Sequence, residues 1–195
     1  MQQSQHISWL CYLSALGITL LCYEYKSVSA MKYDWSQFTQ KININASVEQ
    51  VYRAWTSANH LEQWLVRQAV FKDDGTKLKS SNDPVHSGDT YEWLWHGHGD
   101  KHVDKGKVLV ANGHDKLQFS FTKGGFVTIQ IGEVMGETIV MLTQEKIPTD
   151  EHGKVTYHIG GLTGWTFYLC NLKSYLEGGI DLRNKNSMFA NLVNA

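Results

Sequence analysis

The segment INASVEQVYRAWTSANHLEQWL, residues 44–65, contains the signals that decide the fold. Ser47 and Gln50 match a capping box, in which each side chain accepts a hydrogen bond from the other residue's backbone amide at the start of a helix. Apolar residues then recur at helical spacing and share one face of the predicted helix: Val48, Val51, Tyr52 and Trp55. The segment therefore predicts an amphipathic helix that begins near residue 48.

A second short helix is expected directly after the first. Ser57 is a suitable N-cap residue, because its hydroxyl can accept a hydrogen bond from a free backbone amide. Three apolar residues follow at helical spacing: Leu61, Trp64 and Leu65. On the other side of the capping box, residues 38–45 (FTQKININ) alternate, with Ile42 and Ile44 on one face, and predict a strand.

Beyond Val66 the apolar residues recur at every second position, as is typical of strands. The turns between these segments contain Gly and Asn, and residues 73–87 form a longer polar loop. The pattern predicts an antiparallel meander of about six strands, at residues 66–71, 90–95, 105–110, 117–121, 126–131 and 138–146.

A long helix is predicted over residues 163–177, after a loop at residues 147–161. One apolar stripe runs along it: Trp165, Tyr168, Leu169, Leu172 and Leu176. Gly178 and Gly179 can end the helix in the left-handed conformation. A strand, two helices, a meander and a long helix favour an α+β fold in which a curved sheet packs around the last helix.

Three segments resemble the START-like (SRPBCC, helix-grip) superfamily: residues 44–65, GDTYEWLW at 88–95, and GWTFYLCNLKSYLEGGIDLRN at 164–184. Within it, the chain resembles the family of the C-terminal domain of the activator of heat-shock-protein-90 ATPase. This resemblance implies a helix-grip fold. The fold has a curved antiparallel sheet of about six or seven strands, two short helices after the first strand, and a long C-terminal helix across the sheet. It does not select a function, because members of this superfamily bind ligands, catalyse cyclisations or act as co-chaperones.

The length of the chain indicates one domain plus extensions, and the resemblance implies that this is a START-like domain at residues 33–184, followed by a tail at residues 185–195. The chain has 195 residues and a formal net charge of −1, which argues against a nucleic-acid partner. Residues 1–30 are a hydrophobic extension with three interpretations: an upstream mis-start before Met31, an export signal, or a membrane anchor. We expect a cytoplasmic protein, or an exported one if the extension is a signal peptide.

The stretch YEWLWHGHGDKHVDKG, residues 91–106, raises the question of a metal site, since it contains His96, His98 and His102. The interleaved glycines are more typical of a turn. We therefore expect a solvated hairpin turn, with His96 facing outward, and neither a metal nor a cofactor. His158 and Thr163 are expected to form cap or loop hydrogen bonds, and no catalytic residue is assigned.

The aromatic residues should converge between the sheet and the last helix, as plain core or as the wall of an apolar cavity, which could be vestigial. We predict a non-catalytic domain that binds an apolar small molecule or lipid there, through Trp64, Leu65, Tyr91, Trp93, Trp95, Phe119, Phe121, Trp165, Tyr168, Leu169 and Leu172. Two alternatives remain open. One is a co-chaperone-like stimulator whose partner is a heat-shock-protein-90-type ATPase, and the other is a cyclase- or hydrolase-type enzyme.

Overall fold

The structure, a computed structural model, describes residues 33–74, 76–121, 125–186, 188–189 and 192. The expectations for residues 1–30 lie outside these ranges. The limits expected for the domain and its tail, 33–184 and 185–195, stay predictions. Among the described residues, no helix has the length and apolar character needed to cross a membrane.

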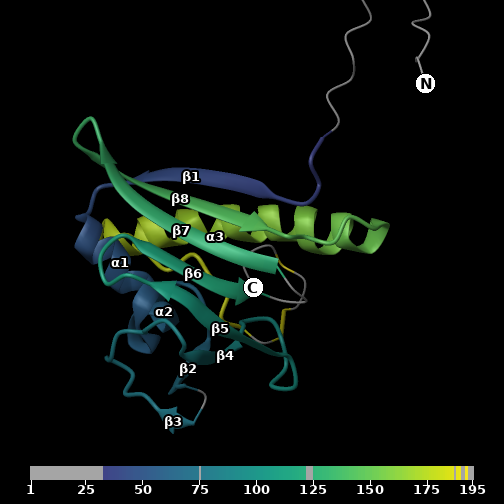
Figure 1. Cartoon of the computed structure of the whole chain (residues 1–195), viewed down its shortest axis with the longest axis horizontal. Coiled ribbons are helices and arrows are strands. Elements are labelled where there is room, and N and C mark those ends of the chain that lie inside the picture. The colour runs from purple at the N-terminus through teal and green to yellow at the C-terminus, as the bar shows by residue number, and fades with distance from the viewer. Residues whose placement is uncertain (1–32, 75, 122–124, 187, 190–191, 193–195) are drawn as a thin grey trace, which may run out of the picture. The chain divides into compact units, whose positions relative to one another are not determined.

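The described strands form one eight-stranded sheet in the order β1-β8-β7-β6-β5-β4-β2-β3. Every neighbouring pair is antiparallel. The first strand lies beside the last, because the two helices after it carry the chain to the opposite edge of the sheet (Figure 1). The bounds are β1 (Phe38–Ile44), β2 (Gln68–Asp73), β3 (Lys77–Leu78), β4 (Thr90–Leu94), β5 (Val103–Ala111), β6 (Lys116–Phe121), β7 (Gly125–Val134) and β8 (Glu137–Glu145).

The predicted strands are confirmed, with ends that shift by a few residues. Burial alternates along β7, where Val127, Ile129 and Ile131 are buried and the residues between them are not. The eighth strand was not expected, since β3 lies within the predicted polar loop. It pairs with the end of β2, where Lys72 lies opposite Leu78.

The two short helices begin at the predicted caps. In α1 (Val48–Thr56), the Ser47 hydroxyl accepts from the Gln50 amide at 3.2 Å, and the Gln50 side chain accepts from the Ser47 amide at 2.9 Å. In α2 (Ala58–Trp64), the Ser57 hydroxyl accepts from the amide of His60. The capping signals are therefore confirmed.

The last helix begins earlier than expected. A π-helix, η1 (Gly153–Ile159), leads directly into α3 (Gly160–Leu176), so the second half of the expected loop at 147–161 is helical. The glycines at 160, 161 and 164 disfavour a helix by propensity alone, and π-helices are too rare to be expected from a sequence. At the other end, Gly178 has a φ of +77°, which confirms the predicted left-handed C-cap.

α3 lies across the concave face of the sheet, as the helix-grip fold requires (Figure 1). Trp165 is 3% exposed, and its ring contacts those of Phe119 and Phe121 on β6. Leu169 and Leu172 of the same stripe are also buried. The expected α+β fold is confirmed.

The segment after α3 is tied to α2 by Arg183, whose guanidinium donates to the backbone oxygens of Glu62 and Val66 at 2.9 and 2.8 Å. Arg183 also pairs with Asp181 at 2.7 Å. Burial raises the pKa of Asp181, but hydrogen bonds from Arg183 and Lys185 outweigh it and hold this pKa well below its usual range. The pair thus caps the C-terminal end of α2, where free carbonyl groups need donors.

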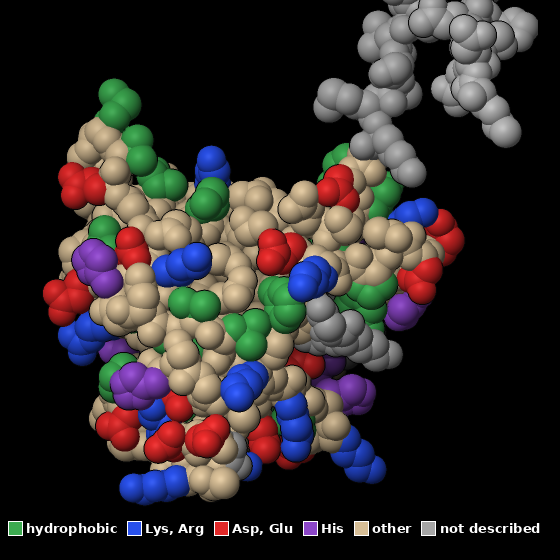
Figure 2. Space-filling model, in the orientation of Figure 1, with side chains coloured by type: hydrophobic (Ala, Val, Ile, Leu, Met, Phe, Trp, Pro, Cys, Tyr) green, Lys and Arg blue, Asp and Glu red, His purple; other side chains and the backbone are tan. Residues whose placement is uncertain are grey.

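The visible surface mixes charges of both signs over the sheet and the loops (Figure 2). The turn between β7 and β8 carries two exposed apolar side chains, Val134 and Met135, which are 56% and 99% exposed. Two side chains make a small area compared with the patches that mark interfaces.

Candidate functional site

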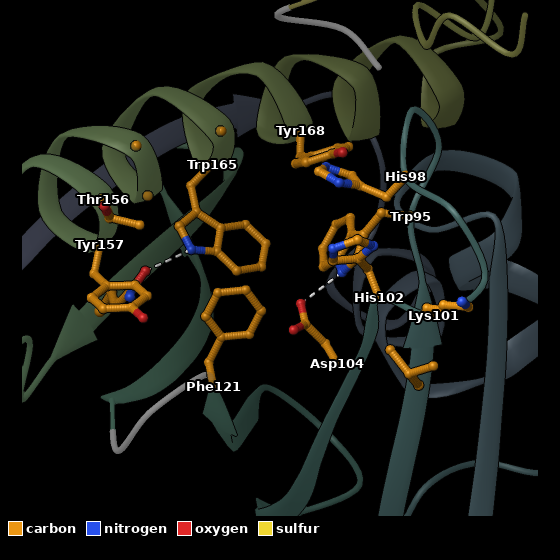
Figure 3. A pocket seen from close by; sticks show the side chains of 15 residues that line it. Trp95, His98, Lys101, His102, Asp104, Phe121, Thr156, Tyr157, Trp165 and Tyr168 are labelled. Carbon is orange, nitrogen blue, oxygen red and sulfur yellow. Dashed lines mark hydrogen bonds between the residues drawn. The ribbon is translucent and has the colours of Figure 1, made fainter. Parts of the chain in front are cut away.

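A pocket of about 640 Å³ opens between the N-terminal half of α3, η1 and the β4–β5 hairpin. Sites for small molecules usually measure roughly 300–1,000 Å³. The floor of the pocket is the concave face of the sheet, and the side chains that line it come from both layers (Figure 3).

Besides Tyr157, four aromatic rings line the pocket and contact one another in turn, and we call them the aromatic box: Trp95, Phe121, Trp165 and Tyr168. Their centroid distances, taken around the box, are 6.4 Å (Trp95–Phe121), 5.4 Å (Phe121–Trp165), 6.4 Å (Trp165–Tyr168) and 5.4 Å (Tyr168–Trp95). Neighbouring rings are inclined to one another by 46° to 82°. In Figure 3 the four rings stand around a space that none of them fills.

Two polar side chains hold the indole rings of the box. The Trp95 indole N–H donates to Asp104 Oδ2 at 2.7 Å, and that of Trp165 donates to Gln144 Oε1 at 2.9 Å. Among the described residues, Asp104 Oδ1 and Gln144 Nε2 have no hydrogen-bond partner. Beside the rings, Asp104 Oδ1 can therefore accept a hydrogen bond from a ligand and Gln144 Nε2 can donate one.

The hydroxyl of Tyr168 stays protonated over the ordinary pH range. Burial raises the pKa of Tyr168 to about 12, although the charge of Arg183 acts in the opposite direction. The ring therefore contributes a neutral wall, with an O–H that can donate or accept.

Three glycines of α3 carry no side chain and so leave space on the helix side of the pocket. Gly160, Gly161 and Gly164 all line it. A Cβ at Gly164 would meet no atom within 4 Å, whereas one at Gly161 would lie 3.1 Å from Gln144 Oε1. Space for a ligand therefore remains beside Gly164.

The stretch at residues 91–106 does form the β4–β5 hairpin, but it is more than a solvated turn. The side chains of His98, Lys101 and His102 line the mouth of the pocket. The rings of the two histidines lie 6.0 Å apart. An ion pair of 2.6 Å between Asp100 and Arg67 holds the hairpin to the chain that follows α2.

His96 does not line the pocket, and it is half-buried. Burial lowers the pKa of His96, and the positive charges of Arg183 and Lys185 lower it further. Within the described ranges, no three His, Cys, Asp or Glu residues are grouped so that they could hold a metal ion.

His158 and Thr163 form hydrogen bonds, as expected. Nδ1 of the buried His158 lies 2.9 Å from the backbone oxygen of Trp35, and the ring of His158 packs edge-on against Trp35 and Phe38. The Thr163 hydroxyl donates to the backbone oxygen of Ile159. Neither residue lines the pocket.

Four of the eleven predicted ligand-binding residues line the pocket, and these four are the aromatic box. The other seven lie outside the pocket wall in the packed core: Trp64, Leu65, Tyr91, Trp93, Phe119, Leu169 and Leu172. Trp93 stacks on Tyr91 at 4.1 Å and meets Phe119 edge-on, so these rings fill their own space. Trp64 and Leu65 are fully buried, so their side chains do not reach the pocket wall. Ligand binding itself stays a prediction.

Sequence reasoning missed Asp104 and Gln144, although a signal for both exists. Each shares a strand face with buried apolar residues, Val108 on β5 and Leu142 on β8. Because side chains alternate along a strand, the sequence places both polar groups on the concave face. A polar residue at a core-facing position was thus the available marker of the pocket.

Comparison with known proteins agrees with this architecture. Residues 45–177 match the model of the family described as Activator of Hsp90 ATPase homolog 1-like protein. The chain belongs to this family. The resemblance expected from the sequence is therefore confirmed, and no curated protein matches the chain.

Solved structures share the fold of this family member at low sequence identity. Protein SSP2350 of Staphylococcus saprophyticus is 17% identical with a TM-score of 0.57, over 80% of this chain and 98% of its own. The Aha1 dimer of Colwellia psychrerythraea is 19% identical with a TM-score of 0.56, over 73% and 97%. DynU16, from the dynemicin biosynthetic locus, is 18% identical with a TM-score of 0.54, over 73% and 47%.

Proposed function

We propose that this protein binds a small, largely apolar molecule in the pocket between α3 and the sheet. The observation that carries the proposal is the aromatic box, whose four rings face an unfilled space. Asp104 and Gln144 add an acceptor and a donor at its edge. Apolar walls with a few placed polar groups are the usual composition of small-molecule sites.

Gly164→Leu tests this proposal, because the new side chain would extend into the open space beside the pocket. The protein is purified from its own host and analysed by native mass spectrometry. We expect the wild type to carry a bound small molecule and Gly164→Leu to lose it. Cys170→Leu is the matched control, since Cys170 is exposed on the same helix and does not line the pocket.

Empty wild-type protein, together with no binding of an apolar fluorescent probe such as anilinonaphthalene sulfonate, would refute the proposal. Equal occupancy of the wild type and Gly164→Leu, with both folded by circular dichroism, would place the ligand elsewhere. Loss of the ligand in Cys170→Leu as well would indicate a general effect on the helix.

A second candidate, an enzyme of the cyclase or hydrolase type, draws support from Asp104. Its carboxylate lies in the pocket with one oxygen without a partner among the described residues. A carboxylate in such a position can take a proton from a bound molecule. Incubating the captured ligand with fresh protein tests this: a new product that Asp104→Asn does not form supports the enzyme, and an unchanged ligand refutes it.

A further inference from the structure

We infer that the pocket takes a carboxylic acid with an apolar body, and that the acid group lies at the β4–β5 hairpin. This inference rests on the proposed function and names the class of ligand. It follows from the hydrogen-bond donors that the hairpin presents at the mouth of the pocket, and from the single carboxylate in the pocket wall.

The hairpin lines the mouth of the pocket with three basic side chains: His98, Lys101 and His102. All three are exposed, and among the described residues none of them forms a hydrogen bond or an ion pair. In Figure 3 they lie on the side of the pocket opposite Thr156 and Tyr157. An ammonium group has three donors, and an imidazole has at least one N–H in either protonation state. Free donors therefore gather on one side of the pocket.

The acidic residue next to Lys101 does not neutralise it. The carboxylate of Asp100 pairs with Arg67 at 2.6 Å, and Asp100 does not line the pocket. Among the described residues that line the pocket, the charges other than those of histidine are Lys101 and Asp104. No ion pair joins these two side chains within the described part of the chain. The ammonium group of Lys101 is therefore available to a ligand.

Beyond the hairpin, the side chains that line the pocket add donors as well. Gln144 Nε2 is a further donor, and the hydroxyls of Tyr157 and Tyr168 can donate or accept. Asp104 Oδ1 is a pure acceptor. A carboxylate has about four acceptor sites and no donor, so it complements this set better than an amine or an amide does.

Asp104 determines where the acid group lies. It is half-buried on β5, and its Oδ2 accepts the Trp95 N–H at 2.7 Å. Two carboxylates repel each other, and the repulsion is stronger where water is excluded. The acid group of the ligand therefore stays at the exposed hairpin, and the apolar body lies beside the rings. A phosphate with two charges would be repelled more strongly than a carboxylate with one.

The test compares three probes that share one apolar body: para-tert-butylbenzoate, its neutral amide para-tert-butylbenzamide, and the cation para-tert-butylbenzylammonium. Binding to the full chain is measured by calorimetry. We expect the benzoate to bind about fivefold more tightly than the amide or the cation, as is typical of a charge pair in contact with solvent. Added salt should weaken the binding of the benzoate and leave that of the amide nearly unchanged.

Lys101→Met removes the charge and nearly keeps the length of the side chain, so it should weaken the benzoate about threefold and leave the amide nearly unchanged. Lys107→Met is the matched control, since Lys107 is exposed on β5 and does not line the pocket. His98→Phe combined with His102→Phe keeps two rings, removes the imidazole N–H groups and should also reduce the preference for the benzoate. Near-ultraviolet circular dichroism confirms that each variant keeps its packed aromatic core.

An amide or a cation that binds as tightly as the benzoate would overturn this inference and leave the proposed apolar pocket intact. Equal losses of benzoate affinity in Lys101→Met and Lys107→Met, or no loss in Lys101→Met, would overturn the placement of the acid group at the hairpin. Failure of all three probes to bind the wild type would count against this inference and against the proposed function together.

Discussion

Gly161 and Gly164 lie three residues apart on one helix, yet substitution by alanine should act on them in opposite directions. Both residues lie in α3, and neither has a left-handed backbone conformation. In a helix, alanine is favoured over glycine by about 0.5–1 kcal/mol. The surroundings of the new methyl group therefore decide the outcome.

At Gly164 the methyl group meets no atom within 4 Å, so Gly164→Ala should retain the full gain. A gain of ~0.5–1 kcal/mol raises the melting temperature of a domain of this size by about 1–4 °C. At Gly161 the methyl group would lie 3.1 Å from Gln144 Oε1 and 3.4 Å from Phe38 Cζ. Gln144 would have to move, and it holds the N–H of the buried Trp165.

Loss of a buried hydrogen bond costs about 1–3 kcal/mol. Gly161→Ala should therefore range from nearly neutral to about 2 kcal/mol destabilising, after the ~1 kcal/mol gain in helix propensity is subtracted. Thermal and urea unfolding of both variants measures the difference. If Gly161→Ala is stabilised as much as Gly164→Ala, the close packing of α3 on β8 is refuted. A destabilised Gly164→Ala would refute the open space beside the pocket.

Three further predictions concern the sheet and two titrating groups. Gly106→Ala should destabilise the protein by about 1–3 kcal/mol, because a Cβ at this position would overlap the ring of Tyr91. Gly132→Ala on β7 is the control, since a Cβ there meets no atom within 4 Å. Equal unfolding midpoints of the two variants would contradict the close packing of Gly106 on Tyr91. Burial raises the pKa of Asp181, but its hydrogen bonds lower this pKa more, so Asp181→Asn should be less stable than the wild type at pH 7. The difference in unfolding free energy should shrink as the pH falls below 3.8. A difference that stays the same at low pH would count against the ion pair. Burial raises the pKa of Tyr168 from 10.0 to about 12, so the stability of the native state should fall as the pH rises through this range. Tyr168→Phe should lose less stability over the same range in alkaline unfolding curves. An equal loss in the variant and the wild type would indicate that the Tyr168 hydroxyl is solvated.

The elements with local signals were predictable. The capping box of Ser47 and Gln50 fixes the start of α1 within four residues of sequence, and the side-chain alternation of β7 follows from its apolar spacing. The stripe on α3 likewise predicted that Trp165 would be buried against the sheet. In each case the periodic pattern reflects one buried face.

The pocket was only partly predictable. Aromatic residues on the concave face include both those that fill the core, such as Trp93, and those that leave a space, such as Trp95. Trp93 and Trp95 follow the same alternation in the sequence, so the pattern does not distinguish a ring that packs in the core from one that lines the pocket. Asp104 lies one residue before the predicted strand at 105–110 but inside β5, so the sequence pattern did not assign it to a strand face.

The anchor at the end of the domain left no local signal. Arg183 follows the last helix in a segment without periodicity, and its partners Glu62 and Val66 are far away in the sequence. An arginine in such a segment is usually solvated. Its burial depends on the path that the chain takes after Gly178, which the local sequence does not determine.

The pairing of β1 with β8 affects the order in which the fold can be completed during synthesis. Phe38 of β1 lies opposite Gln144 of β8, so β1 waits for β8 to be synthesised before the two can pair. Non-local pairing of this kind slows folding and leaves an open edge in the nascent chain. We expect this protein to acquire its protease-resistant state only after β8 and α3 have left the exit tunnel.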